Sequence, residues 1–260
     1  MMFAAQRREK IVEWLKLKGQ VVVKELAKEM NVSEGTLRTD LRMLEDEGVI
    51  ERTHGGAVLA NKKNSFRGDS FVARSEMNYA EKRAIGQQAA QLVTKGQCIL
   101  LDASSTVLEL AKVLADYDYL TVVTNGLDAA MTLNQNPRIN VILIGGVLRS
   151  GSRTVEGVLG KNLLDGIHGD LFFTSAEGVS VEEGMTDFSL YEAELKKKMA
   201  SNARKTIALA DHTKLGRRSI ATSVELAGIH TLITDGKADK RYLEKIKGVE
   251  IIIAAANDNK

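Results

Sequence analysis

The residues best suited to chemistry form a hydroxyl-rich stretch at 101–107, which reads LDASSTV. An apolar run precedes it and a helical pattern follows it, so the stretch is expected where a strand ends and a helix begins. Hydroxyl groups, free backbone amides and the positive end of a helix dipole meet at such a place and favour a phosphate group. The stretch suits both an enzyme that converts a phosphorylated substrate and a sensor that only binds one.

Polar residues also follow several other apolar runs. Thr124 and Asn125 end one run, Gly145 and Gly146 end the next, and Lys214 lies shortly after a third. Open α/β sheets bind ligands at the carboxyl ends of their strands, where Lys214 would supply a cation for phosphate. Each motif alone is more often a plain cap or turn, but together they predict an effector site. Its members are Asp102, Ser104, Ser105, Thr106, Thr124, Asn125, Gly145, Gly146, Glu177 and Lys214.

The pattern of apolar residues after residue 78 predicts the elements that position this site. Short apolar runs alternate with helical stretches at 80–93, 105–115 and 189–203. Unbroken apolar strands between helices are typical of a sheet covered on both faces, so we predict an α/β domain with a mainly parallel sheet over 79–260. The strand-like runs are CILLDA, LTVVTN, NVILIGG, DLFFTSA, TIALAD, HTLITD and VEIIIAA.

Residues 1–60 show a different pattern, with three short helices and a hairpin. Apolar residues recur at helical spacing in three stretches, Ser33 is a good N-cap for the third helix, and Gly48 ends it. A short strand is expected in GQVVV, and VIERTHGGAVLA predicts two more strands around a Gly-Gly turn. The order helix, strand, helix, helix, hairpin is that of a winged helix-turn-helix. Residues 61–78 are polar and basic, and we expect them to be a linker.

The third helix leaves one face for DNA. Its apolar stripe occupies another face, while Glu34, Arg38 and Arg42 recur four residues apart. The second helix of a helix-turn-helix enters the major groove, where arginine pairs with guanine. The alternative is a charged face that contacts only water, but the capped helix and the Gly-Gly wing favour DNA. The predicted DNA-binding residues are Arg7, Ser33, Glu34, Thr36, Arg38, Thr39, Arg42, Arg52, Thr53, His54, Gly55 and Gly56.

Composition narrows the class of protein. The chain has 260 residues, 44% of them hydrophobic and 27% charged, which is ordinary for globular domains. The net charge is only +2, and residues 1–60 hold ten Lys or Arg and ten Asp or Glu, so DNA affinity must come from one-sided placement of charge. The single cysteine, Cys98, is expected to be a buried structural thiol. Charges stand where a signal peptide needs apolar residues, so we expect a cytoplasmic protein without a membrane partner.

The segment VSEGTLRTDLRMLEDEGVIERTHGGA at 32–57 closely resembles the helix-turn-helix and wing of the DeoR family of bacterial transcriptional repressors. DASST, VVTNGL, LIGG, FFTSAEGV and ALADHTKLG follow in the order of DeoR-type sensor domains, whose fold is similar to ribose-5-phosphate isomerase. The resemblance implies a repressor of a carbohydrate-metabolism operon. It also implies double-stranded operator DNA, a phosphorylated sugar effector and a homo-oligomer, dimer or tetramer, as partners.

Two positions depart from the family pattern. Thr39 stands where a basic residue is common, which implies one phosphate contact fewer. Ser104 stands where glycine is usual. Because a non-glycine residue disfavours a positive φ by roughly 1 kcal/mol, Ser104 implies an altered loop or a new hydroxyl contact.

The alternative function is an isomerase-like enzyme with an appended DNA-binding head. Such an isomerase needs a carboxylate as its general base. Where the resemblance places three isomerase carboxylates, this sequence keeps one as Glu177 but has Thr174 and Lys196 at the other two, so we expect no enzyme. Glu192 and Glu194 would restore a base if the alignment slipped by one turn, although an exposed helix face is expected for both. The histidines lack metal or triad spacing, so no metal or cofactor is expected, and only His212 is a candidate ligand contact.

Overall fold

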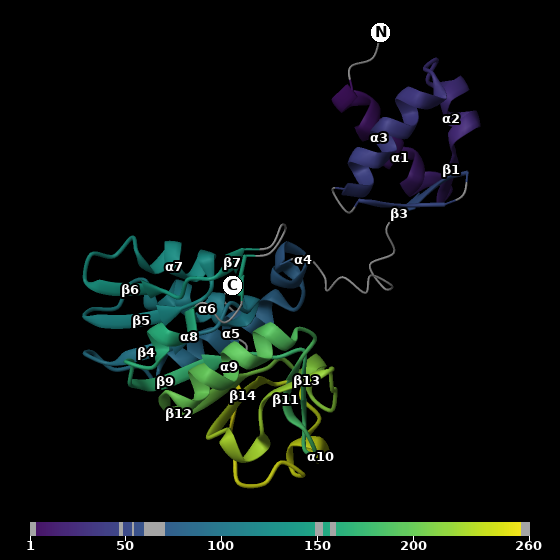
Figure 1. Cartoon of the computed structure of the whole chain (residues 1–260). Coiled ribbons are helices and arrows are strands. Elements are labelled where there is room, and N and C mark those ends of the chain that lie inside the picture. The colour runs from purple at the N-terminus through teal and green to yellow at the C-terminus, as the bar shows by residue number, and fades with distance from the viewer. Residues whose placement is uncertain are drawn as a thin grey trace. The chain divides into compact units, whose positions relative to one another are not determined.

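The computed structural model describes residues 4–46, 49–53, 55–59, 71–148, 153–156 and 160–255. The chain divides into two units, Met1–Asp69 and Ser70–Lys260 (Figure 1). Each unit has its own hydrophobic core. None of the described helices is long and apolar enough to cross a membrane.

The N-terminal unit has the predicted winged helix-turn-helix order. Its elements are α1 (Ala4–Lys18), β1 (Gln20–Val22), α2 (Val23–Glu29), α3 (Glu34–Asp46), β2 (Ile50–Arg52) and β3 (Gly56–Leu59). The helices pack around a core that includes Ile11, Leu26 and Leu41. The strands pair antiparallel in the order β1-β3-β2. The predicted helix end at Gly48 lies outside the described residues.

The second unit is built on a seven-stranded sheet, whose strands are the seven predicted apolar runs. They are β4 (Cys98–Leu101), β5 (Leu120–Thr124), β6 (Ile139–Leu143), β9 (Gly169–Thr174), β12 (Ala203–Leu209), β14 (Thr231–Asp235) and β15 (Glu250–Ala254). The spatial order is β15-β14-β12-β9-β4-β5-β6, and the pairings are parallel. The predicted parallel α/β architecture is therefore confirmed.

Helices cover both faces of this sheet. They are α5 (Tyr79–Ala90), α6 (Ser105–Leu114), α7 (Leu127–Leu133), α8 (Lys161–Leu164), α9 (Leu190–Ser201) and α10 (Lys240–Leu243). Along β4, Ile99 and Leu101 pack in a core with α5, α6 and α7, whereas Leu100 between them packs with α8 and α9. Successive side chains of a strand point to opposite faces, so one unbroken apolar run supplies both cores.

Two small antiparallel sheets accompany the large one and were not expected from the sequence. One has the order β10-β11-β13, with β10 (Gly178–Ser180), β11 (Gly184–Asp187) and β13 (Ala221–Val224). The other pairs β7 (Val147–Leu148) with β8 (Val155–Glu156). Helix α9 packs along β13. Among the described residues, 3-10 turns include η2 (His212–Lys214) and η3 (Leu226–Gly228).

The segment at 61–78, predicted to be a linker, is described only in part. Residues 61–70 lie outside the described residues, whereas residues 71–76 form the helix α4 (Phe71–Glu76). Phe71 is buried in the core of the second unit. This helix could not be predicted from the sequence, because a single buried side chain makes no periodic pattern.

Cys98 differs from the prediction of a buried thiol. It is half-buried at the start of β4, where its backbone N–H donates to Asp170 at 2.9 Å. Desolvation by burial, together with the carboxylate of Asp170, raises the pKa of the Cys98 thiol. A raised pKa disfavours the reactive thiolate, which agrees with a structural role.

Gly56 is needed where β3 pairs with β1. A Cβ at this residue would lie 1.8 Å from the carbonyl oxygen of Val21, whereas a Cβ at Gly55 would meet nothing within 4 Å. We expect Gly56→Ala to lower the free energy of unfolding of the N-terminal unit by about 3 kcal/mol, because the strands must separate. Gly55→Ala is the control and should change it by less than about 0.5 kcal/mol.

The measurement uses the single tryptophan, Trp14, which packs against the core of the N-terminal unit. Its fluorescence during urea unfolding reports on this unit alone. Equal stability of the two alanine variants would contradict a required close approach at Gly56.

Candidate functional site

The predicted DNA-binding face lies on α3 and begins at a capped end. The hydroxyl of Ser33 accepts from the backbone N–H of Thr36 at 3.1 Å, which is the predicted N-cap. The exposed residues of this face are Ser33, Glu34, Arg38, Thr39 and Arg42. Arg38 donates to Glu34 at 3.0 Å across one helical turn. An exposed ion pair of this kind contributes little, so it is easily exchanged for a contact with a base edge.

Arg7 takes part in the fold of the same unit. Its guanidinium donates to both carboxylate oxygens of the buried Asp40, at 2.6 and 3.2 Å, and so joins α1 to α3. The hydrogen bond that Arg7 donates to Asp40 raises the pKa of the Arg7 guanidinium. The pair fixes α3 against α1 and thereby orients the face that carries Arg38. Contact between Arg7 and a DNA phosphate stays a prediction.

The wing presents Arg52 and Thr53 to solvent. The backbone N–H of Thr53 donates to the carbonyl of Gly56 at 3.1 Å and closes the hairpin turn. The small size of Gly56 serves the pairing of β3 with β1, while the space around Gly55 is open. The predicted contact at His54 lies outside the described residues.

The predicted effector residues lie along one edge of the large sheet, at the carboxyl ends of five neighbouring strands. In spatial order these are Lys214 after β12, Glu177 after β9, Asp102 after β4, Asn125 after β5 and Gly145 after β6. Neighbouring strands lie about 4.8 Å apart, so the ends of β12 and β6 are roughly 19 Å apart. One sugar phosphate is too short to reach both, and Asp102 marks the middle of the edge.

The loop after β4 decides between the two alternatives for Ser104. Its φ of −74° and ψ of 154° are extended, so the position demands no glycine and carries no strain. The Ser104 hydroxyl accepts from the N–H of Val107 at 3.2 Å and caps α6. The new hydroxyl contact that the sequence allowed is therefore a helix cap. Ser105 and Thr106 are buried in the first turn of α6.

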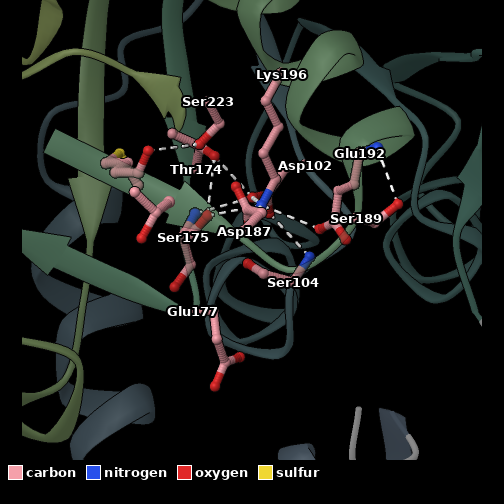
Figure 2. Close-up of polar contacts among 12 residues, drawn as sticks. Asp102, Ser104, Thr174, Ser175, Glu177, Asp187, Ser189, Glu192, Lys196 and Ser223 are labelled. Atoms are coloured by element: carbon pink, nitrogen blue, oxygen red, sulfur yellow. Dashed lines mark hydrogen bonds and ion pairs between the residues drawn. The ribbon is translucent and has the colours of Figure 1, made fainter. Parts of the chain in front are cut away.

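Asp102 is the buried centre of a hydrogen-bond network at this edge (Figure 2). Its Oδ1 accepts from the N–H of Ser104 at 2.8 Å. Its Oδ2 accepts from the hydroxyl of Thr174 and the N–H of Ser175, both at 2.8 Å. Both carboxylate oxygens are engaged within the fold, so Asp102 positions the loop that bears Ser104.

Lys196, which the resemblance places at the isomerase base, is a buried cation (Figure 2). Its Nζ lies 2.8 Å from Asp187, 3.0 Å from Glu192 and 3.4 Å from Asp102. Desolvation lowers the pKa of Lys196, but these carboxylates outweigh it and hold the pKa well above the usual value. Burial raises the pKa of Asp187. A lysine held protonated cannot accept a proton from a substrate.

Glu192 corrects a further expectation. It was expected on an exposed helix face, but its side chain is only 17% exposed because it packs against Lys196. Glu194 is exposed as expected and pairs with Lys197 at 3.2 Å. The two glutamates therefore differ in environment although they are two residues apart.

The ends of β5 and β6 are closed by β8 and the residues before it. The Asn125 side-chain N–H donates to the carbonyl of Val155 at 3.1 Å, while its Oδ1 is buried without a partner among the described residues. The buried hydroxyl of Thr124 accepts from a backbone N–H two residues later. A Cβ at Gly146 would lie 2.5 Å from the carbonyl oxygen of Glu156, so glycine is needed there. A role for Asn125 in an effector site stays a prediction.

Lys214 lies in η2, with its Nζ 3.3 Å from Glu177. Both side chains are partly exposed, at 20% for Lys214 and 42% for Glu177, so a ligand can exchange with this pair. Asp211 accepts from the N–H of Thr213 at 3.0 Å and caps the turn. The side chain of Asn78, just before α5, also donates to Asp211 at 3.1 Å. The turn that carries Lys214 is therefore tied to the start of α5.

His212 and His230 have partners in the fold. The backbone N–H of His212 donates to Asp235 at 2.7 Å, and its ring Nδ1 lies 3.1 Å from the same carboxylate. The His230 ring accepts from the N–H of Thr206 at 3.1 Å. Within the described residues, no group of three or more His, Cys, Asp or Glu could hold a metal ion.

A surface pocket of about 470 Å³ lies beside α4, the middle of α6 and the start of α7. Phe71, Tyr79, Leu108 and Arg153 are among its lining residues. The lining described by the structure contains none of the predicted effector residues. The pocket is therefore separate from the edge residues around Asp102.

Sequence reasoning missed Asp187 and Asn78. Asp187 ends a four-residue strand, and nine residues separate it from Lys196 without any helical or strand period. Asn78 lies in a turn. The pair Glu192–Lys196 did leave a signal, because opposite charges four residues apart on a helix are neighbours.

Comparison with known proteins matches both units. Residues 77–236 match the DeoR C terminal sensor domain, and residues 7–63 match the DeoR-like helix-turn-helix domain. The chain belongs to the DeoR family. The predicted resemblance is therefore confirmed, and the two DeoR matches fall on the two units of the fold.

Two relatives show how far the DeoR similarity extends. The HTH-type transcriptional regulator GolR of Listeria innocua is 44% identical over 255 residues, 98% of this chain and 100% of that protein. The glycerol-3-phosphate regulon repressor of Haemophilus influenzae is 28% identical over 231 residues, 88% of each chain. Among solved structures, ribose 5-phosphate isomerase A from Neisseria gonorrhoeae has a TM-score of 0.41 and 16% identity, over 56% of this chain and 55% of that one. This last likeness is too distant to support a conclusion.

Lys196 provides a test of the charge network in the DeoR sensor unit. Lys196→Met leaves three carboxylates without their buried cation, so we expect the free energy of unfolding to fall by about 3–5 kcal/mol at pH 8. The loss should be smaller at pH 5, because carboxylates whose pKa has risen take up protons as the pH falls. Urea unfolding followed by circular dichroism at both pH values measures this.

The control is Lys197→Met on the same helix. Lys197 is 52% exposed and its partner Glu194 is 50% exposed, so this variant should lose less than about 1 kcal/mol. A Lys196 variant as stable as the Lys197 variant would contradict the role of the buried cation.

Proposed function

We propose that this DeoR-family chain is a transcriptional repressor that binds operator DNA and is released by a phosphorylated sugar. The DNA-binding half rests on one observation, the exposed row of Glu34, Arg38 and Arg42 on a capped helix that Asp40 ties to α1. A helix held in this way enters the major groove, where arginine pairs with guanine. The name of the Haemophilus relative supports repression, and we extend it to a carbohydrate-metabolism operon in the cytoplasm.

The effector site is proposed at the middle of the sheet edge. Helix α6 has ten residues, and the N–H groups of its first turn favour an anion. Lys214 adds a cation on one side, and the buried Oδ1 of Asn125 accepts a sugar hydroxyl on the other. The name of the Haemophilus relative contains a phosphorylated polyol, which agrees with this chemistry.

The contact between Asn78 and Asp211 links this site to the DNA-binding unit along the chain. Asn78 lies between α4 and α5, and Lys82 on α5 donates to the carbonyl of Arg74 on α4. Helix α4 is the first described helix after the N-terminal unit in sequence. An effector shifts an equilibrium only by its differential affinity for two states, so an inducer must bind the DNA-free arrangement more tightly.

The enzyme alternative is not favoured by the residues at the expected catalytic positions. Lys196 is held protonated by its carboxylate partners, and Thr174 donates its hydroxyl to Asp102. Neither residue supplies the carboxylate base that isomerisation needs. The curated relatives are likewise regulators of transcription by name.

We further propose that the repressor acts as a dimer or tetramer. Helix-turn-helix proteins read operator half-sites about one DNA turn apart with two heads related by two-fold symmetry. Residues 1–60 carry ten basic and ten acidic side chains, so one head alone gains little from net charge. Two linked heads raise the affinity without new contacts.

Arg38→Ala tests the DNA-reading role of α3. We expect specific operator affinity to fall by about 10–100-fold, because one arginine contact to a base is worth about 1–3 kcal/mol. Fluorescence anisotropy with operator DNA selected from random sequences by the wild-type protein measures the change. Arg138→Ala removes an exposed arginine of the sensor unit, 57% exposed, and should leave affinity unchanged. Loss of sugar-phosphate stabilisation in Arg38→Ala would contradict separate roles for the two units.

Lys214→Met tests the effector site. We screen glycerol 3-phosphate, ribose 5-phosphate and glucose 6-phosphate by thermal shift. A ligand at 100-fold its Kd adds about 2.7 kcal/mol to stability, and a tenfold weaker variant would gain about 1.4 kcal/mol. Lys205→Met, on an exposed residue early in β12, should keep the full shift. Equal shifts in both variants would remove Lys214 from the effector site.

A further inference from the structure

An apolar surface is exposed at the start of α9, and the proposed function does not yet use it. It consists of Phe188, Leu190, Tyr191 and Ile220, with exposed fractions of 42%, 64%, 57% and 77%. We call these four residues the α9 patch. Single exposed apolar residues are ordinary, but a contiguous group marks an interaction surface.

Strand pairing brings Ile220 beside the rest of the α9 patch. Asp187 of β11 pairs with Ala221 of β13 in antiparallel register. Phe188 follows Asp187 and Ile220 precedes Ala221, so these two residues lie opposite one another where the strands end. Leu190 begins α9, which packs along β13. The four side chains therefore belong to one surface.

The size of the α9 patch fits the centre of a protein interface. A large aromatic side chain buries about 150–250 Å² when covered, so four large side chains about half exposed present on the order of 400 Å². A stable interface buries about 800 Å² on each partner, with its most apolar part at the centre. The α9 patch alone supplies roughly half of that area.

The charges around the α9 patch suit a second copy of the same chain. Arg217 and Arg218 lie just before Ile220, and the Arg218 side chain is 78% exposed. Glu194 lies one turn after Leu190 on α9 and is half exposed. In a two-fold contact a residue of one copy meets a different residue of the other. Arg218 and Glu194 already have the exposed partners Glu183 and Lys197, and pairs this exposed can be exchanged for one between Arg218 of one copy and Glu194 of the other, around a shared apolar centre.

We propose that two copies of this chain associate through the α9 patch. The inference deepens the proposed function and rests on it, because an operator-binding pair needs a two-fold contact. The patch also shares its backbone with the buried charge network, since Asp187 precedes Phe188 and Glu192 follows Tyr191. Both carboxylates bind Lys196. A second copy on the patch therefore holds the segment that borders the effector edge, which links association to effector binding.

Ile220→Asp tests the proposal in the full chain. The new carboxylate stays in water in a monomer but enters the apolar centre of a pair. In sedimentation velocity over a concentration series, we expect association at least tenfold weaker than that of the wild type. Leu190→Lys is a second variant with the same expected result. Met131→Asp on α7, 68% exposed and outside the patch, is the matched control and should associate as the wild type does.

Unchanged association of both patch variants overturns the proposal, and so does a wild-type chain that stays monomeric throughout the series. It is also overturned if the patch variants associate normally but lose the thermal shift with sugar phosphates, because the patch then covers a ligand. Failure of the proposed function is seen separately. In that case the wild-type chain itself shows neither operator binding nor a sugar-phosphate shift, whatever the patch variants do.

Discussion

The ion pairs of Lys196 are the interactions on which the sensor unit depends. They join Asp102 at the end of β4, Asp187 in β11 and Glu192 on α9, which belong to three different elements. Buried carboxylates without a cation would each cost several kcal/mol, so the ammonium group of Lys196 allows Asp102 and Asp187 to be buried beside one another. Asp102 in turn holds the N–H of Ser104. The ion pair between Lys196 and Asp102 thus helps to position the loop suited to phosphate.

The ion pairs of Lys196 also bear on whether this edge of the sheet could catalyse a reaction. A carboxylate at the position of Lys196 would be a proton acceptor beside the phosphate-suited loop, whereas an ammonium group held protonated neutralises its neighbours. Lys214 is different, because its single partner Glu177 is partly exposed and can be exchanged for a ligand. One lysine therefore stabilises the site and the other remains available to an anion. This division of roles is what the proposed function, effector binding without turnover, requires of the two lysines.

The seven strands of the large sheet could be predicted because each contains a short apolar run, and the inner strands β4, β5 and β9 are buried along most of their length. The small sheets could not, since strands of two to four residues such as β11 have no readable period. The loop position of Ser104 was predictable, but its φ was not, because the family glycine suggested a conformation that the cap makes unnecessary. Lys196 was singled out as a missing base. Its partner Asp187 is close only in the folded chain.

The free energy of the proposed link between effector and DNA can be compared with the backbone strain at Asn78. Asn78 adopts a φ of 50°, a left-handed conformation that asparagine tolerates better than most residues but that still costs roughly 1 kcal/mol. Asp211 caps the turn that carries Lys214. The hydrogen bond that Asn78 donates to Asp211 helps to hold Asn78 in this conformation. Coupling between two sites in allosteric proteins is typically about 1–3 kcal/mol. The conformation of Asn78 therefore holds free energy on the scale that the proposed coupling would require.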